Sequence, residues 1–248
     1  MNYGAKRQGG SPLYGTEAAV AGEKAMSLID RIDALLFPPK CVLCGKILDR
    51  NELDLCRNCR TDAPECNGKT AKLPFVDSWL ALWHYEGLVR RSLLRYKFYG
   101  KRHYALSYGR LLAMKLQQER EDAYDLVTWV PISRWRKLRR GYDQVELLAQ
   151  GVCAELGVEP IQCLKKIRHN RAQSKIVGQA HRRANVLGVY DVVDKERFQG
   201  KRILLLDDII TTGATVGECA RVLLTAGAEE VHCAAIAAAN HHKKGEKV

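Results

Sequence analysis

The segment from residue 203 to residue 215 restricts the fold of this chain more than any other part of the sequence. It begins with the continuous apolar run Ile203–Leu206, which is typical of a strand buried in the middle of a parallel sheet. Asp207 and Asp208 come next, and the polar turn Thr211–Thr215 then precedes a helix predicted from about residue 216 to residue 226. This order of strand, turn and helix predicts an α/β fold whose strand binds a ligand at its carboxyl end.

The chemistry of this segment favours one class of ligand. A turn rich in threonine and glycine at the start of a helix directs hydroxyl and backbone N–H groups at a phosphate. Because carboxylates repel phosphate, Asp207 and Asp208 are expected to face something else, most naturally the diol of a ribose. A polar strand end or a plain helix cap explains either half alone, but the contiguous combination predicts a ribose 5-phosphate cradle. The predicted phosphate-binding residues are Thr211, Thr212, Gly213, Ala214 and Thr215.

Alternating strand and helix patterns surround this segment. Asp143 and Glu146 form a capping signal for a helix that ends near Gly157. Apolar periodicity predicts strands at residues 76–83, 126–130, 203–206 and 231–239, and further helices at residues 87–98, 106–118 and 216–226. Strands and helices in this order predict a parallel sheet covered by helices.

Five of the nine cysteines lie within 26 residues. Four of them form two C-x-x-C pairs separated by eleven residues, a spacing that suits two knuckles around one tetrahedral Zn²⁺. Disulfides or redox-active pairs are the alternative, but a chain without an export signal is expected in a reducing cytoplasm, where metal is favoured. The predicted ligands of this structural zinc are Cys41, Cys44, Cys56 and Cys59. Cys66 is left as a spare thiol, and four further cysteines are expected in the core: Cys153, Cys163, Cys219 and Cys233.

Composition supports a folded protein with an anionic ligand. The chain has 40 Lys and Arg against 28 Asp and Glu, a net charge of +12, which suggests a nucleic acid or a phosphorylated metabolite as partner. No apolar run reaches the ~20 residues of a membrane span, and no secretory signal is apparent. The expected organisation is a disordered start with an amphipathic helix over residues 1–36, a zinc module over 37–66, an α/β domain over 75–240 and a basic tail over 241–248.

The polar segment of residues 207–215 resembles the ligand signature of type I phosphoribosyltransferases. Four further features occur in the order found in the ComF family, whose members include competence-associated and GntX-like proteins. They are the cysteine module after Phe37-Pro38-Pro39, the K-x-x-G segment of residues 97–100, Val130-Pro131, and the R-R-G-Y-D-Q segment of residues 139–144. Ser133 and Asp143 differ from the proline and asparagine usual in the family, and the stretch from Gln173 to Asn185 matches its pattern only loosely.

This resemblance implies a protein that binds 5-phosphoribosyl pyrophosphate with Mg²⁺. Asp207 and Asp208 would hold the ribose 2′ and 3′ hydroxyls, and residues 211–215 would wrap the 5′-phosphate. The implied pyrophosphate loop follows the strand at residues 126–130 and consists of Pro131, Ile132 and Ser133. The implied reaction is transfer of the phosphoribosyl group to an unidentified acceptor with release of pyrophosphate, which makes the chain a pentosyltransferase.

A cationic cluster over residues 134–140 directly follows this predicted loop. Arginine and lysine stabilise the charge that develops on departing pyrophosphate, so Arg139 or Arg140, and then Lys137, are the catalytic candidates. A solvated face is the simpler interpretation of such a cluster. Trp135 among the cations also fits a protein that binds single-stranded DNA during DNA uptake. A third possibility is a protein that senses 5-phosphoribosyl pyrophosphate without catalysis.

Overall fold

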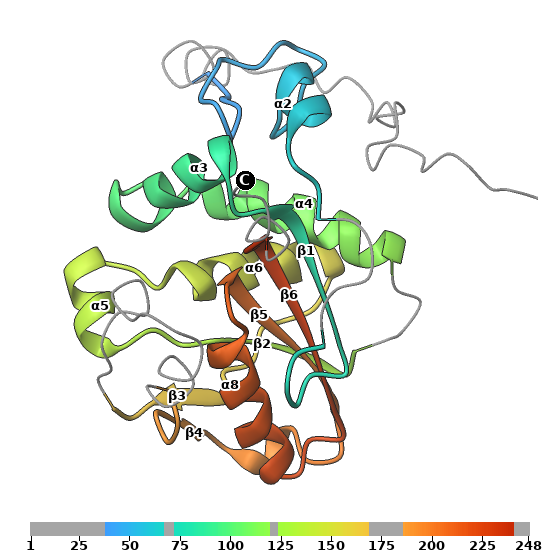
Figure 1. Cartoon of the computed structure of the whole chain (residues 1–248), viewed down its shortest axis with the longest axis vertical. Helices are drawn as coiled ribbons and strands as arrows, with labels where there is room; N and C mark the ends of the chain where they lie inside the picture. The colour runs from blue at the N-terminus through green and yellow to red at the C-terminus, as the bar shows by residue number, and fades with distance from the viewer. Residues whose placement is uncertain (1–37, 67–71, 120–123, 169–185, 241–248) are drawn as a thin grey trace, which may run out of the picture. The chain divides into compact units, whose positions relative to one another are not determined.

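A parallel sheet of four strands lies at the centre of the fold, in the order β1-β6-β5-β2 (Figure 1). The strands are β1 (Ser78–His84), β2 (Leu126–Trp129), β5 (Arg202–Ile210) and β6 (Glu230–Ala238). The computed structural model describes residues 38–66, 72–119, 124–168 and 186–240. The parallel pairing confirms the α/β fold expected from the alternating patterns.

Strand β5 is longer than its apolar run predicts. Asp207 pairs in register with Ala235 of β6, and the ladder continues to Ile210. The two carboxylates therefore lie within the strand and not beyond its end, because Asp207, and Ile209 and Ile210 after Asp208, still pair with β6. Successive side chains of a strand point to opposite faces, so the two aspartates enter different surroundings.

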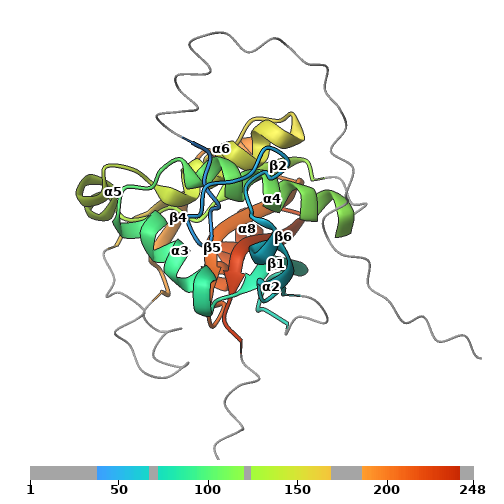
Figure 2. The same cartoon turned by 90° about the horizontal axis from the view of Figure 1, so that it is seen from above.

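Helices cover both faces of the sheet (Figures 1 and 2). Helices α4 (Tyr104–Glu119) and α6 (Gln144–Leu156) pack together on one face, and α8 (Ala214–Thr225) packs on the other. Helix α3 (Gly87–Phe98) precedes α4 in the chain. Gly109 of α4 and Gly151 of α6 let the two backbones touch, because a Cβ added to Gly109 would lie 2.5 Å from the Gly151 carbonyl carbon. This contact sets the spacing of the two helices.

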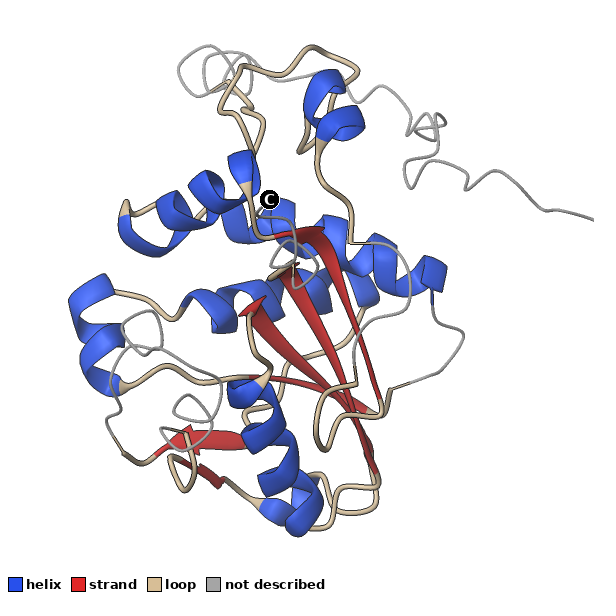
Figure 3. Ribbon diagram, viewed as in Figure 1, coloured by secondary structure: helices blue, strands red, loops and turns tan. Residues whose placement is uncertain are grey.

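The remaining elements are short (Figure 3). They are the helices α2 (Arg57–Asp62) and α5 (Arg134–Arg140), the 3-10 turn η2 (Lys195–Arg197), and an antiparallel pair of strands, β3 (Leu164–Lys166) and β4 (Tyr190–Val192). The predicted start of α6 is confirmed: the Asp143 carboxylate accepts hydrogen bonds from the backbone N–H groups of Val145 and Glu146, at 2.9 and 3.2 Å. The left-handed Gly157 ends the same helix.

The described residues from Lys40 onward belong to one compact unit. Its core contains the four cysteines predicted to be buried, Cys153, Cys163, Cys219 and Cys233, each at most 1% exposed. Cys66 is also buried and belongs, with Cys163, Cys219 and Cys233, to the core around β5 and α8. Among the described residues, no helix combines the length and the apolar character needed to cross a membrane. The helix and disorder predicted before residue 37, the basic tail and the Gln173–Asn185 pattern lie outside the described residues.

Candidate functional site

Asp208 is the centre of a hydrogen-bonded network that joins three elements. Its Oδ1 lies 2.8 Å from the Lys97 ammonium at the end of α3, and its Oδ2 accepts a hydrogen bond of 2.8 Å from the side-chain amide of Gln144, at the start of α6. The side-chain oxygen of Gln144, Oε1, in turn accepts a hydrogen bond of 2.6 Å from the guanidinium of Arg140 in α5. The network is largely closed to solvent, since the side chains of Lys97 and Asp208 are only 17% and 7% exposed.

Asp207 lies on the opposite face, and its surroundings favour the neutral carboxyl. Burial and the charge of Asp208 raise its pKa well above the usual range of an aspartate. Among the described residues, the Asp207 carboxyl group has one hydrogen-bond partner: its Oδ1 accepts from the backbone N–H of Asp208, at 2.7 Å. The two carboxylates thus differ in their environments: one is paired with a cation, and the other is buried without one.

Lys166, which the sequence shows only as one cation of a basic cluster with no assigned role, is close enough to Asp207 for their charges to interact. Its ammonium lies 3.4 Å from the Tyr190 hydroxyl and 5.1 Å from the centre of the Tyr190 ring, across the pair β3–β4. Burial and the nearby Arg136 lower the pKa of Lys166 to about 8, an effect that Asp207 partly offsets. No signal in the sequence distinguishes this lysine from its exposed neighbours, because its burial depends on a three-residue strand.

The threonine- and glycine-rich turn leads from β5 into α8 as predicted. Gly213 adopts φ +71°, a conformation that favours glycine, and the helix begins at Ala214, whose N–H lies 3.5 Å from the Thr212 hydroxyl. The positive end of a 12-residue helix is thereby directed at the turn. Leu73 packs against Gly213, because an added Cβ would lie 2.3 Å from its Cδ2.

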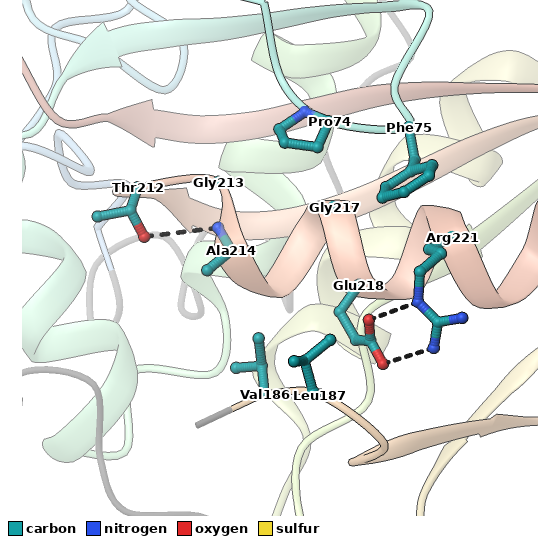
Figure 4. A pocket seen from close by; sticks show the side chains of 10 residues that line it. All are labelled: Pro74, Phe75, Val186, Leu187, Thr212, Gly213, Ala214, Gly217, Glu218 and Arg221. Atoms are coloured by element: carbon teal, nitrogen blue, oxygen red, sulfur yellow. Dashed lines mark hydrogen bonds and ion pairs between the residues drawn. The ribbon is translucent and has the colours of Figure 1, made fainter. Parts of the chain in front are cut away.

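A small cavity of about 110 Å³ lies beside this turn (Figure 4). Helix α8 forms one wall, which includes the Glu218–Arg221 ion pair on that helix, and apolar side chains from other segments form the remaining walls. The ring of Phe75 and the side chains of Val186 and Leu187 face this helix. Neither Asp207 nor Asp208 lines the cavity, so it is separate from the carboxylates.

The segment predicted to form the pyrophosphate loop is engaged by neighbouring residues. The Ser133 hydroxyl accepts a hydrogen bond from the backbone N–H of Arg136 and caps α5, and the Ile132 N–H donates to Asp143 at 3.2 Å. Pro131 is buried at the end of β2. Asp143 therefore ties this segment to the start of α6, while the exposed Lys137 pairs with Glu146 at 2.7 Å.

The other two catalytic candidates of α5 lie near one another and near Lys97. Arg139 lies over the ring of Trp135 at 5.2 Å, and Arg140 lies over the ring of Phe98 at 4.9 Å. Burial lowers the pKa of Arg140, an effect that the charge of Asp208 opposes. Of the three cations named from the sequence, Arg140 is the one whose hydrogen bonds reach the aspartate pair, through Gln144.

The four predicted zinc ligands meet at one point. The Sγ atoms of Cys41, Cys44, Cys56 and Cys59 all lie within 4.8 Å of one another, and none of the nine cysteines forms a disulfide. Zn–S bonds of about 2.3 Å place tetrahedral sulfurs about 3.8 Å apart. Cys44 and Cys56 are separated by 3.7 Å, so the donor set fits a structural Zn²⁺.

This zinc module is joined to the helices by polar contacts. The carbonyls of Val42 and Leu43, inside the first C-x-x-C pair, accept hydrogen bonds from Ser92 and Arg95 of α3. Arg110 of α4 forms a two-pronged ion pair with the buried Asp54. Helix α3, which carries Lys97, is therefore held directly by the metal-binding loop.

Comparisons with known proteins agree with this architecture. Residues 144–247 match the family described as "Phosphoribosyl transferase domain", and residues 32–70 match the family described as "Double zinc ribbon domain". Competence protein F of Haemophilus influenzae is 26% identical over 71% of this chain and 81% of its own length. Competence protein ComFC of Streptococcus pneumoniae is 26% identical over 77% of this chain and 96% of its own. DNA utilization protein YhgH of Salmonella typhimurium is 26% identical over 77% and 86%.

A solved structure of an allosteric regulatory enzyme of purine biosynthesis overlaps 58% of this chain and 30% of its own, at 26% identity. Its TM-score of 0.39 is too low to add support. The domain matches, the relatives and the order of motifs are nevertheless consistent with one another. The chain thus carries a phosphoribosyltransferase-type domain after a zinc ribbon, and over 71–77% of its length it is similar to competence proteins such as ComFC.

Proposed function

We propose that the protein binds 5-phosphoribosyl pyrophosphate and transfers its phosphoribosyl group to an acceptor, releasing pyrophosphate. The observation that supports this most is the pairing of two features on β5 and α8. A buried pair of carboxylates suits the hydroxyls of a ribose, and a turn at the positive end of a helix suits a phosphate. Only the residues from Ile209 to Thr211 separate Asp208 from Thr212, so the two features are close together along the chain.

The two aspartates would divide the ribose hydroxyls between them. Asp208, whose oxygens are fixed by Lys97 and Gln144, would accept a hydrogen bond from one hydroxyl. Asp207, whose pKa is raised by burial and by Asp208, would donate one from its neutral carboxyl. Residues Thr211–Thr215 would hold the 5′-phosphate, which fixes the sugar at both ends.

On the pyrophosphate side, Arg140 is our preferred catalytic residue among Lys137, Arg139 and Arg140. It is half-buried and is linked to Asp208 through Gln144, whereas Lys137 is exposed and paired with Glu146. Pro131, Ile132 and Ser133 remain the proposed pyrophosphate loop, in which the Ile132 N–H is held by Asp143. Mg²⁺, bound with the ligand, would neutralise part of the phosphate charge. The Arg140 guanidinium would then stabilise the remaining negative charge on the departing pyrophosphate.

Calorimetric titration of the zinc-loaded chain with 5-phosphoribosyl pyrophosphate and Mg²⁺ tests this proposal. We expect saturable 1:1 binding, and we expect Asp207→Asn combined with Asp208→Asn to abolish it in a protein that still folds. The absence of binding by folded wild-type protein at millimolar ligand would refute the proposal. Binding without pyrophosphate release for any acceptor would indicate a sensor.

A second candidate function, binding of single-stranded DNA, is favoured by exposed aromatic side chains. Trp135 and Tyr99 are 56% and 72% exposed, and Arg139 lies over the Trp135 ring. Exposed rings between cations bind single strands by stacking and by phosphate contacts. Three relatives carry competence or DNA-utilization names, which agrees with such a role. An oligonucleotide bound along several cations would lose affinity steeply with salt, and binding insensitive to salt would exclude this candidate.

A further inference from the structure

The ends of α3 and α5 enclose a hollow of about 160 Å³ next to Asp208. Six residues line it. Three are cations, Lys97, Arg139 and Arg140, two are aromatic, Phe98 and Tyr142, and the sixth is Gly100. The sequence places these residues in two motifs without indicating that they share one cavity.

The positive charge of this hollow is poorly compensated. Among the described residues, neither Arg139 nor Arg140 has a carboxylate partner, since both lie over aromatic rings and Arg140 donates to the neutral Gln144. Arg102 adds a further cation, 4.9 Å from the centre of the Tyr142 ring. Converging cations that lack carboxylates form a site that an oxyanion completes, because charge-assisted hydrogen bonds are the strong ones.

Lys97 connects this hollow to the aspartate pair. Its ammonium has three hydrogen-bond donors, and Asp208 is its one hydrogen-bonding partner among the described residues. Two donors therefore remain on the ammonium of a side chain that lines the hollow. A lysine that served only as a buried counter-ion would need no such access.

We propose that Lys97 binds an oxyanion of the phosphate type in this hollow while it holds Asp208. One ammonium would then join the carboxylate that binds the ribose to the charged group next to it. The identity of that group as the pyrophosphate end of the ligand rests on the proposed function. The contact between Lys97 and an oxyanion does not, so the two proposals can be tested separately.

Inorganic pyrophosphate is the probe, titrated into the full zinc-loaded chain by calorimetry. Two variants break the same ion pair from opposite sides, Lys97→Met and Asp208→Asn. We expect Lys97→Met to weaken pyrophosphate binding at least tenfold, since it removes a charge-assisted donor. Asp208→Asn should bind pyrophosphate as well as wild type or better, because it removes a nearby negative charge and leaves the ammonium in place. Lys97→Arg should restore most of the affinity.

Equal loss in Lys97→Met and Asp208→Asn would mean that the pair is only structural and would overturn the proposal, as would unchanged binding in Lys97→Met. Arg140→Gln, which leaves the Lys97–Asp208 pair intact, should also lose affinity, and this variant decides the matter if Lys97→Met does not fold. The exposed Lys101→Met is the matched control and should bind like wild type.

Wild-type protein that binds pyrophosphate through Lys97 but does not bind 5-phosphoribosyl pyrophosphate would refute the proposed function alone. Wild-type protein that does not bind inorganic pyrophosphate at millimolar concentration would refute the present proposal.

Discussion

Substitution of Gly109 by alanine sets two opposing effects against each other. Alanine is the better helix former by about 1 kcal/mol, which by itself would stabilise α4. The added Cβ would, however, lie 2.5, 2.7 and 2.9 Å from the C, Cα and O atoms of Gly151. Carbon atoms in contact stay about 3.5–4.0 Å apart, so the helices would have to separate by about 1 Å.

Overpacking of this kind costs about 1–3 kcal/mol, and here the upper part of that range applies because the obstructing atoms are backbone. We therefore expect Gly109→Ala to lower the free energy of unfolding by about 1–2 kcal/mol. Urea denaturation of the zinc-loaded protein measures this as a lower midpoint with an unchanged slope. Gln117→Ala, on the exposed side of the same helix, is the control and should have little effect. A Gly109→Ala protein more stable than wild type would refute the close helix contact.

Three further predictions concern metal, burial and pH. Purified protein should contain about one zinc per chain, and a strong chelator should expose four additional reactive thiols and lower the unfolding midpoint. Arg110→Ala should destabilise the protein by up to about 3 kcal/mol, since it leaves the buried Asp54 without its partner, and Arg110→Lys should recover part of the loss in urea denaturation. For Lys166, the unfolded chain keeps its proton to about pH 10.5 while the native lysine loses it near pH 8. Between these pH values the unfolded state thus binds more protons than the native state. The free energy of unfolding of the wild type, compared with that of Lys166→Met, should therefore rise with pH in this range, and a difference that does not change with pH would contradict the burial of Lys166.

The general fold and the zinc ligands follow closely from the sequence. Strong local patterns explain this success: the Asp143 cap defines the start of α6, and the two C-x-x-C spacings define four thiols around one point. Helix α3 was predicted with its observed bounds of Gly87 and Phe98, because its apolar residues repeat at helical spacing.

The parts that could not be predicted depend on contacts between distant segments. The strand β5 continues through Asp207 and Asp208 because β6 supplies a pairing edge, which no local pattern reveals. The strands β3 and β4 have three residues each and are too short to show a period. Lys97 is named from the sequence only as part of the K-x-x-G segment, and nothing in that segment indicates its ion pair with Asp208, 111 residues further along the chain.

The ion pair between Lys97 and Asp208 also has a consequence for how the molecule is made. Its two members are 111 residues apart, so a ribosome that adds about 5–20 residues per second needs roughly 6–22 s to pass from one to the other. During that time α3 exists without the strand that its lysine will contact. A chain interrupted before β5 contains the four metal-binding cysteines and the residues of α3, yet it lacks Asp207 and Asp208, the proposed ribose-binding residues. The binding proposed above would therefore report on complete synthesis, and such a ligand could stabilise only finished molecules.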